Sequence, residues 1–123
     1  MPCACSRGNT TLIYACSGAA NTGYLADQVA RALSKDGAGT MTCLAALGPN
    51  TSGSVESARG AGHTIVIDGC PVGCGKRVFD SIAIPFEHFV TTQFNVEKGK
   101  TLITGEIIMD VTSRVKASIC NGK

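Results

Sequence analysis

The chain has 123 residues, a formal net charge of +2, 44% hydrophobic residues and 16% charged residues. This length suits one domain that buries its own core, and the hydrophobic content excludes a disordered chain. The small net charge and the scattered Lys and Arg side chains argue against nucleic-acid binding. No apolar run reaches the roughly 20 residues of a membrane helix, and no export signal is recognisable, so we expect a cytoplasmic protein without a membrane partner.

The cysteine content narrows the function classes further. Seven cysteines are an odd number, and structural disulfides are rare in a reducing compartment, so metal binding or redox chemistry is the first expectation. We expect residues 1–10 to form an N-terminal arm that carries Cys3 and Cys5, residues 11–119 to form the α/β domain, and residues 120–123 to form a tail. Cys120 receives no role.

The first half of the chain predicts a strand, a helix and a second strand. Thr11–Cys16 is a compact apolar run that ends in Ser-Gly and predicts a buried strand. Asn21 or Thr22 can cap the helix that follows, and Asp36-Gly37 ends it. The apolar run Met41–Leu47, stopped by Gly-Pro-Asn, predicts the second strand.

The second half continues the alternation of helices and strands. We expect a short helix, the clearest strand of the chain, a helix that starts at a proline, a further strand and a last helix capped by a threonine. In chain order these are Ser54–Ala61, Thr64–Asp68, the segment from Pro71 to the residue before Pro85, His88–Thr92, and the segment after Thr104. This order predicts a single three-layer α/β/α domain with a mostly parallel, Rossmann-like or flavodoxin-like open sheet of about four strands.

Cysteines stand where three of the apolar runs give way to glycine and small polar residues. They are Cys16, Cys43, and the pair Cys70 and Cys74. In an open α/β sheet the carboxyl ends of parallel strands share one edge, where ligands bind, so thiols distant in sequence can converge there. Four thiolates satisfy tetrahedral zinc, although Cu(I) and iron–sulfur clusters also suit soft sulfur ligands. The sequence therefore predicts a soft-metal site, with a metal ion as the expected partner.

Thiol chemistry without a metal is the rival hypothesis. A helix that starts at Pro71 would place its positive end beside Cys70 and Cys74 and lower their pKa values. A lowered pKa favours a metal ligand and a redox nucleophile alike, so Cys70 and Cys74 are also candidates for a disulfide or persulfide exchange. Cys43 lies inside an apolar run, where a free cysteine is commonly an inert core residue. A pure interaction module is the third hypothesis, and no pattern decides whether the protein is an enzyme.

Other polar residues give weaker signals. The segment Ser17–Gly23 lacks the lysine of a P-loop, so a tight strand-to-helix turn explains it better than nucleotide binding. We expect Asp68 to cap the helix that follows it, ahead of a role in orienting a metal ligand. His63 and His88 are isolated and are interpreted as ordinary strand-end residues.

The sequence resembles the DGC-domain family, which is named for the Asp-Gly-Cys motif found here at Asp68-Gly69-Cys70. The resemblance runs from about Thr11 into the final helix. It includes the segments Cys16-Ser17-Gly18-Ala19-Ala20, Cys43-Leu44-Ala45, Ile67-Asp68-Gly69-Cys70-Pro71 with Cys74, and Glu97-Lys98-Gly99-Lys100. Members are described as zinc-binding because they carry four chelating cysteines. The resemblance thus implies zinc as the cofactor and Cys16, Cys43, Cys70 and Cys74 as its ligands, and it implies no reaction.

Overall fold

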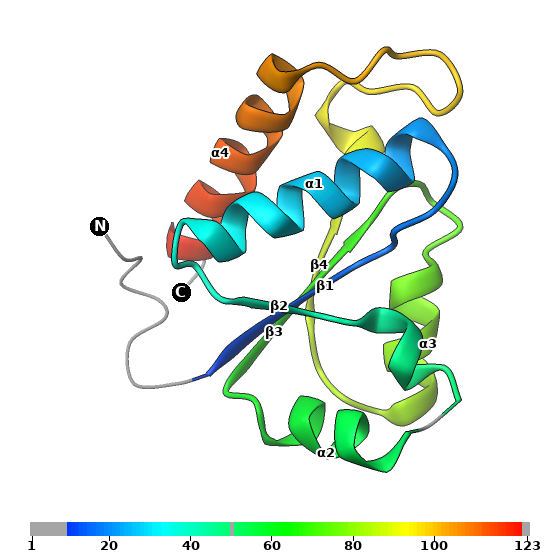
Figure 1. The fold of residues 1–123 in the computed structure, drawn as a ribbon, viewed down its shortest axis with the longest axis vertical. Coiled ribbons are helices and arrows are strands. Elements are labelled where there is room, and N and C mark those ends of the chain that lie inside the picture. Colours follow the sequence, from blue (N-terminus) through cyan, green and yellow to red (C-terminus); the bar gives the residue numbers. More distant parts are fainter. Residues whose placement is uncertain (1–9, 50, 122–123) are drawn as a thin grey trace.

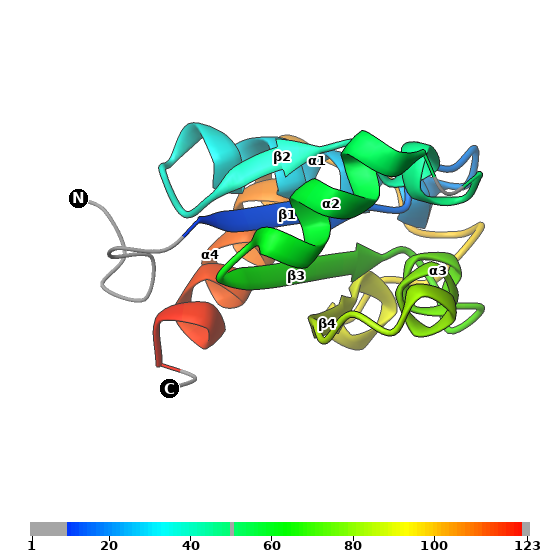
Figure 2. The same ribbon diagram turned by 90° about the horizontal axis from the view of Figure 1, so that it is seen from below.

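The protein is a parallel α/β domain in a computed structural model, which describes residues 10–49 and 51–121. Four strands form one sheet in the order β2-β1-β3-β4, and every neighbouring pair is parallel. Figure 2 shows the strands side by side in this order. Their bounds are β1 Thr11–Ala15, β2 Thr40–Thr42, β3 His63–Asp68 and β4 Glu87–Val90. The expected class, a single α/β domain with an open parallel sheet, is confirmed.

Helices cover both faces of the sheet (Figure 1). The helix α1 (Asn21–Lys35) packs beside α4 (Gly105–Asn121) on one face, and α2 (Ser52–Gly60) and α3 (Cys74–Ile82) lie on the other. Two short 3₁₀ helices, η2 (Leu44–Leu47) and η3 (Thr91–Phe94), follow β2 and β4. Ile13 pairs with Ile65 under α1, while Tyr14 pairs with Val66 under α3. Because side chains alternate along a strand, each face acquires its own apolar core.

Several expected elements differ from the structure in their bounds, among them the helix expected at Ser54–Ala61, which is α2 at Ser52–Gly60. The predicted strand Met41–Leu47 is wrong in extent, since β2 ends at Thr42 and the Leu-Ala-Ala-Leu segment forms η2. A short apolar run does not distinguish a strand from a helical turn. The predicted strand His88–Thr92 is shifted, because β4 begins at Glu87 and ends at Val90.

A further difference concerns the start of α3. The helix begins at Cys74 and not at Pro71, because Gly73 adopts a left-handed conformation with φ of 65°. Cys70 therefore belongs to a turn, closed by a hydrogen bond from the Gly73 amide to the Cys70 carbonyl (3.1 Å). Cys70 and Cys74 do not lie one helical turn apart on a single helix.

The two ends of the chain bear on the expected boundaries. Helix α4 runs to Asn121 and so includes Cys120, which we expected in a tail. Cys3 and Cys5 lie outside the described residues.

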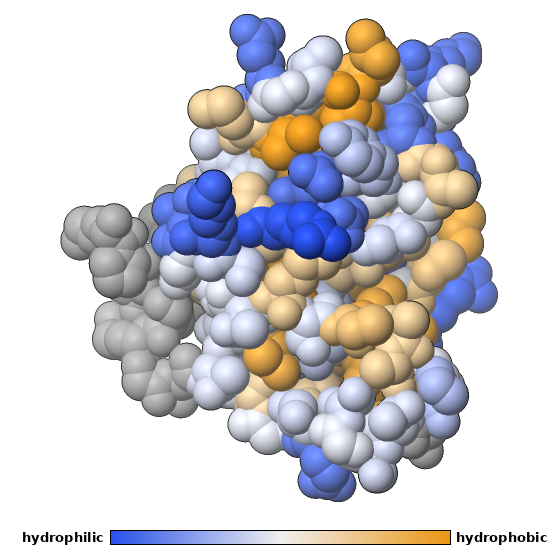
Figure 3. Space-filling view, viewed as in Figure 1, coloured by the Kyte–Doolittle hydropathy of each residue, from blue (hydrophilic) through white to orange (hydrophobic). Residues whose placement is uncertain are grey.

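Among residues 10–49 and 51–121, no helix has the length and apolarity needed to cross a membrane. Figure 3 shows the apolar side chains of one face in separate groups divided by polar ones.

Candidate thiol site

Three cysteine-bearing loops leave the carboxyl edge of the sheet. Cys16 directly follows β1, Cys43 directly follows β2, and Cys70 comes two residues after the end of β3. A pocket of about 720 Å³ opens at this edge, and Cys16, Cys43 and Cys74 all line it. Residues far apart in the sequence thus share one cavity because the parallel strands all end on the same side.

Cys16 and Cys74 line the same pocket, and Cys74 affects the pKa of the Cys16 thiol. The Cys16 thiol is half-buried, and burial raises its pKa above the ordinary value. The neighbouring Cys74 raises this pKa further through charge repulsion and a hydrogen bond, and the amide of Gly69 lowers it by donating a hydrogen bond to the sulfur. Cys16 is therefore held as a neutral thiol in the metal-free protein at neutral pH.

Cys70 stands beside a cation. Its Sγ lies 3.4 Å from the Lys98 Nζ, on a turn that joins η3 to α4. Asn21 fixes this turn, because its side-chain amide donates to the carbonyls of Glu97 (3.0 Å) and Thr101 (2.8 Å) and accepts from the Gly99 amide (2.7 Å). The expected role of Asn21 or Thr22 as a helix cap is wrong, since α1 begins at Asn21 without a side-chain cap.

Glycines let the loops that carry the cysteines pack backbone against backbone. A Cβ placed on Gly69 would stand 2.7 Å from the backbone of Thr22 and Gly23. A Cβ on Gly23 would stand 2.7 Å from the Gly18 amide nitrogen. The loop after β1, the start of α1 and the loop after β3 therefore form one closely packed layer beneath the thiols.

Asp68 connects β3 to α3 and to β4. It is fully buried and accepts hydrogen bonds from the amides of Gly75 (2.7 Å) and Lys76 (3.1 Å) in the first turn of α3. The expected capping role is confirmed. The Nε2 of His88 lies 2.6 Å from the same carboxylate, so His88 is part of the support of the site and not an ordinary strand-end residue.

A charged group lies on the rim of the thiol pocket. Asp27 accepts hydrogen bonds from the Ser17 hydroxyl and the Arg31 Nε, both at 2.7 Å. Burial raises the pKa of Asp27, but the hydrogen bonds from Arg31 and Ser17 outweigh it, and the net effect lowers this pKa. Ser17 thus turns toward α1, as expected for a tight strand-to-helix turn.

Four residues of the site have no role that is predicted from the sequence: Lys98, His88, Asp27 and Arg31. The sequence points to Lys98 alone among these four, because the Glu97-Lys98-Gly99-Lys100 turn is one of the segments that carry the family resemblance. The other three act through partners that lie in different elements or one helical turn away.

The four predicted ligands are of the right chemical kind for a thiophilic ion, but their positions do not form a finished site. Among residues 10–49 and 51–121, no three side chains of His, Cys, Asp or Glu are grouped so that they could hold one metal ion. Cys43 and Cys74 are exposed, whereas Cys16 and Cys70 are half-buried. The thiols suit zinc as donors, and shared binding requires rotation of the exposed side chains.

The fold and these loops define a small parallel α/β domain with cysteines at its strand ends. The chain belongs to the DGC domain family, which matches residues 12–115. It is similar to the anaerobic and virulence modulator AnvM of Pseudomonas aeruginosa, with 37% identity over 88 residues that cover 71% of this chain and 67% of that protein. The comparison with solved structures gives no match.

Proposed function

We propose that the protein binds a zinc ion through Cys16, Cys43, Cys70 and Cys74 and that the site has a structural or regulatory role. One observation carries the proposal: three of these thiols, from three different segments, line one pocket at the carboxyl edge of the sheet. The half-buried fourth, Cys70, sits in the neighbouring turn after β3.

Several features of the chain would serve such a site. A bound zinc ion would tie the three loops together and thereby stabilise the fold. Asp68 holds the start of α3, and with it Cys74, through two amide hydrogen bonds. Lys98 would offset part of the negative charge that thiolate ligands bring, because its ammonium already lies beside Cys70.

A regulatory role agrees with the name of the relative. AnvM is called an anaerobic and virulence modulator, and no reaction appears in that name. No pair of carboxylates or Ser-His-Asp arrangement lines the thiol pocket among the described residues. The proposal therefore assigns no catalytic residue.

Metal analysis of protein purified under reducing conditions tests the proposal. We expect about one equivalent of zinc, as four thiolate ligands require. Cys16→Ser and Cys70→Ser should each remove most of the metal, while Cys120→Ser, the matched control in α4, should retain it. Less than about half an equivalent in the unaltered protein, or metal content that neither Cys16→Ser nor Cys70→Ser changes, contradicts the proposal.

A second function, reversible thiol oxidation, draws support from the presence of Cys16 and Cys74 in one pocket. Two thiols would lose two electrons and two protons to a small-molecule disulfide, which would leave as two thiols. The geometry favours Cys16 as the partner of Cys74, since Cys70 instead lies beside Lys98. Peptide mass mapping after treatment with oxidised glutathione should then find a reversible disulfide at Cys74, and its complete absence would remove this function.

A further inference from the structure

A second pocket opens at the opposite edge of the sheet, where the parallel strands begin. Its volume is about 500 Å³, and it is lined by the end of α2, the start of β3 and the connection from α3 to β4. It shares no lining residue with the thiol pocket. Any ligand held here would therefore be bound independently of the cysteines.

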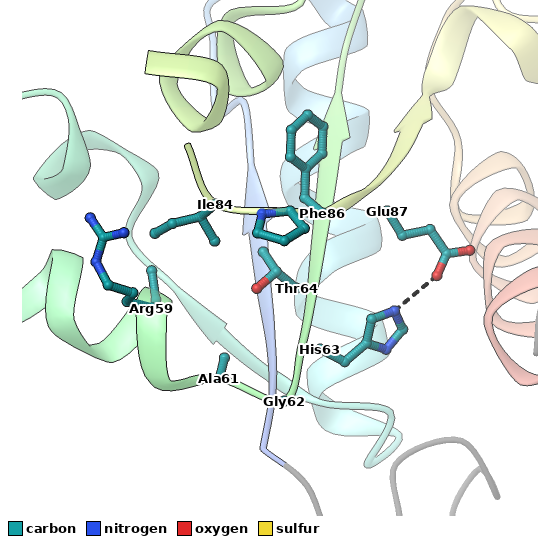
Figure 4. Close-up of a pocket in the computed structure, with 10 residues that line it drawn as sticks. Arg59, Ala61, Gly62, His63, Thr64, Ile84, Phe86 and Glu87 are labelled. Carbon is teal, nitrogen blue, oxygen red and sulfur yellow. Dashed lines mark hydrogen bonds and ion pairs between the residues drawn. The ribbon is translucent and has the colours of Figure 1, made fainter. Parts of the chain in front are cut away.

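The pocket exists because the helices on this face do not close over the sheet. On the other face α1 and α4 pack side by side, whereas α2 and α3 make few contacts with each other. Helix α3 ends at Ile82, because the next residue, Ala83, has a left-handed backbone (φ of 57°) and Pro85 prevents continuation of the helix. The chain then crosses the sheet edge as an extended segment, and a hollow is left between this segment and α2 (Figure 4).

Apolar side chains form the floor of this hollow. Ala58 is 1% exposed and Ile84 is 6% exposed, and Phe86 is half-buried beside them. Phe86 also packs on Phe79, with ring centroids 5.6 Å apart, so this wall is held rigidly by the core. Such a floor favours a ligand with an apolar or aromatic body.

Three ionisable side chains line the pocket: Arg59, His63 and Glu87. Glu87 is paired with His63 at 3.0 Å, so its carboxylate is already satisfied. Arg59, in the last turn of α2, takes part in none of the ion pairs formed among the described residues. In Figure 4 Arg59 and Thr64 lie to one side of β3, and the His63–Glu87 pair lies to the other.

Thr64 strengthens the case for a polar ligand group. Thr64 is only 4% exposed, and it lines this pocket. A guanidinium and a hydroxyl that face one space from two elements can donate to the same carboxylate, for which the planar guanidinium is well shaped.

We propose that this pocket is a binding site for a small organic carboxylate with an apolar body, in which Arg59 and Thr64 hold the carboxylate and Ile84 and Phe86 contact the body. The volume falls within the range of small-molecule sites, which runs from about 300 to 1,000 Å³. The site is distinct from the thiol pocket and does not depend on metal binding.

Amide NMR titration of the full chain with 3-phenylpropionate tests the proposal, with 3-phenylpropanol as the neutral probe of similar shape. We expect saturable shifts at residues 58–64 and 84–87 with the carboxylate and weaker binding of the alcohol. Arg59→Gln should lower the affinity for 3-phenylpropionate about three- to fivefold, which is the limit for a partly exposed ion pair. The affinity for 3-phenylpropanol should stay unchanged.

The matched control is Arg114→Gln, because Arg114 is an exposed arginine of α4 that pairs with Asp110 away from the pocket. This variant should bind 3-phenylpropionate as the unaltered protein does. The proposal is overturned if the carboxylate causes no shifts in the pocket, if the two probes bind equally well, or if Arg59→Gln and Arg114→Gln have the same affinity.

Discussion

Asp68 holds three elements together through one side chain. Its buried carboxylate accepts from two amides of α3 and lies against the His88 ring, so it joins β3, α3 and β4 at one point. An asparagine at this position has one acceptor oxygen and presents an NH₂ group to the other donors. The burial of Asp68 makes such a mismatch costly.

We therefore expect Asp68→Asn to lower the free energy of unfolding by about 2–3 kcal/mol, because a charged acceptor is lost and a buried donor is left without a partner. Urea denaturation followed by circular dichroism measures this change. Asp80→Asn is the matched control, since Asp80 forms only an exposed ion pair with Lys76, and it should cost less than about 1 kcal/mol. Equal effects of the two substitutions would contradict the assigned role of Asp68.

Cys16 should react with a distinctive pH dependence. Burial, followed by the repulsion from Cys74, raises its pKa, so alkylation of the metal-free protein by iodoacetamide should have its midpoint at a higher pH than that of free cysteine. Removing the neighbour in Cys74→Ser should move the midpoint part of the way back. Cys43→Ser is the control and should leave it unchanged, because Cys43 is not among the groups that shift the Cys16 pKa.

The same shift links Cys16 to stability. The raised pKa means that the folded state keeps this proton at pH values where the unfolded state has lost it. The stability contributed by Cys16 is therefore complete below the ordinary thiol pKa and declines as the pH rises toward the raised pKa. The extent of Cys16 alkylation can be followed by peptide mass analysis across a pH series. A midpoint at or below that of free cysteine would contradict the raised pKa and the pH dependence of stability that follows from it.

At the scale of the elements, the close approach of the loops depends on Gly69. Gly69→Ala would place a Cβ 2.7 Å from the backbone of Thr22 and Gly23, which has no flexible end to move aside. We expect a loss of about 1–3 kcal/mol in the free energy of unfolding, measured in urea, together with faster alkylation of Cys16 as the loops separate. Gly53→Ala, where the added Cβ meets nothing within 4 Å, should be neutral or slightly stabilising.

The elements that could be predicted from the sequence are those with a strong local signal. The β-branched run before Asp68 is a strand, and Thr104 caps α4 by accepting from the Ile107 amide at 3.3 Å. Asp36-Gly37 ends α1, with Gly37 at φ of 84°. In each case the residues that decide the structure are neighbours in the chain.

Other features of the fold and the site could not be predicted from the sequence, because they depend on residues that are distant in the chain. Helix α3 starts at Cys74 since the Asp68 carboxylate receives the Gly75 amide, and the local proline signal at Pro71 is overridden. Asn21 binds a turn 76–80 residues away, which no local pattern indicates. The parallel topology that the sequence predicts places the cysteines at strand ends, as observed. It does not predict which thiol lies beside Cys74, because that depends on side-chain packing.

At the scale of the whole molecule, two apolar cores share one thin sheet. Val115 lies in the core between α4 and the sheet, and Phe79 lies in the core under α3, where its ring meets Tyr14 at 4.8 Å between centroids. Both side chains are fully buried. Because β1 and β3 contribute alternate residues to both cores, loss of packing on one face should weaken the other.

We therefore expect Phe79→Ala and Val115→Ala to lower the stability of a single cooperative transition, by about 3–5 kcal/mol and about 2 kcal/mol respectively. Far-UV circular dichroism reports all helices, and the near-UV signal of buried Tyr14 reports the α3 face, so the two urea curves should coincide in each variant. Leu102→Ala, a control that is 81% exposed, should cost less than about 0.5 kcal/mol. If Phe79→Ala separated the two curves, the faces would unfold independently, and the thiol loops, which leave the shared strands, would not be held by both cores.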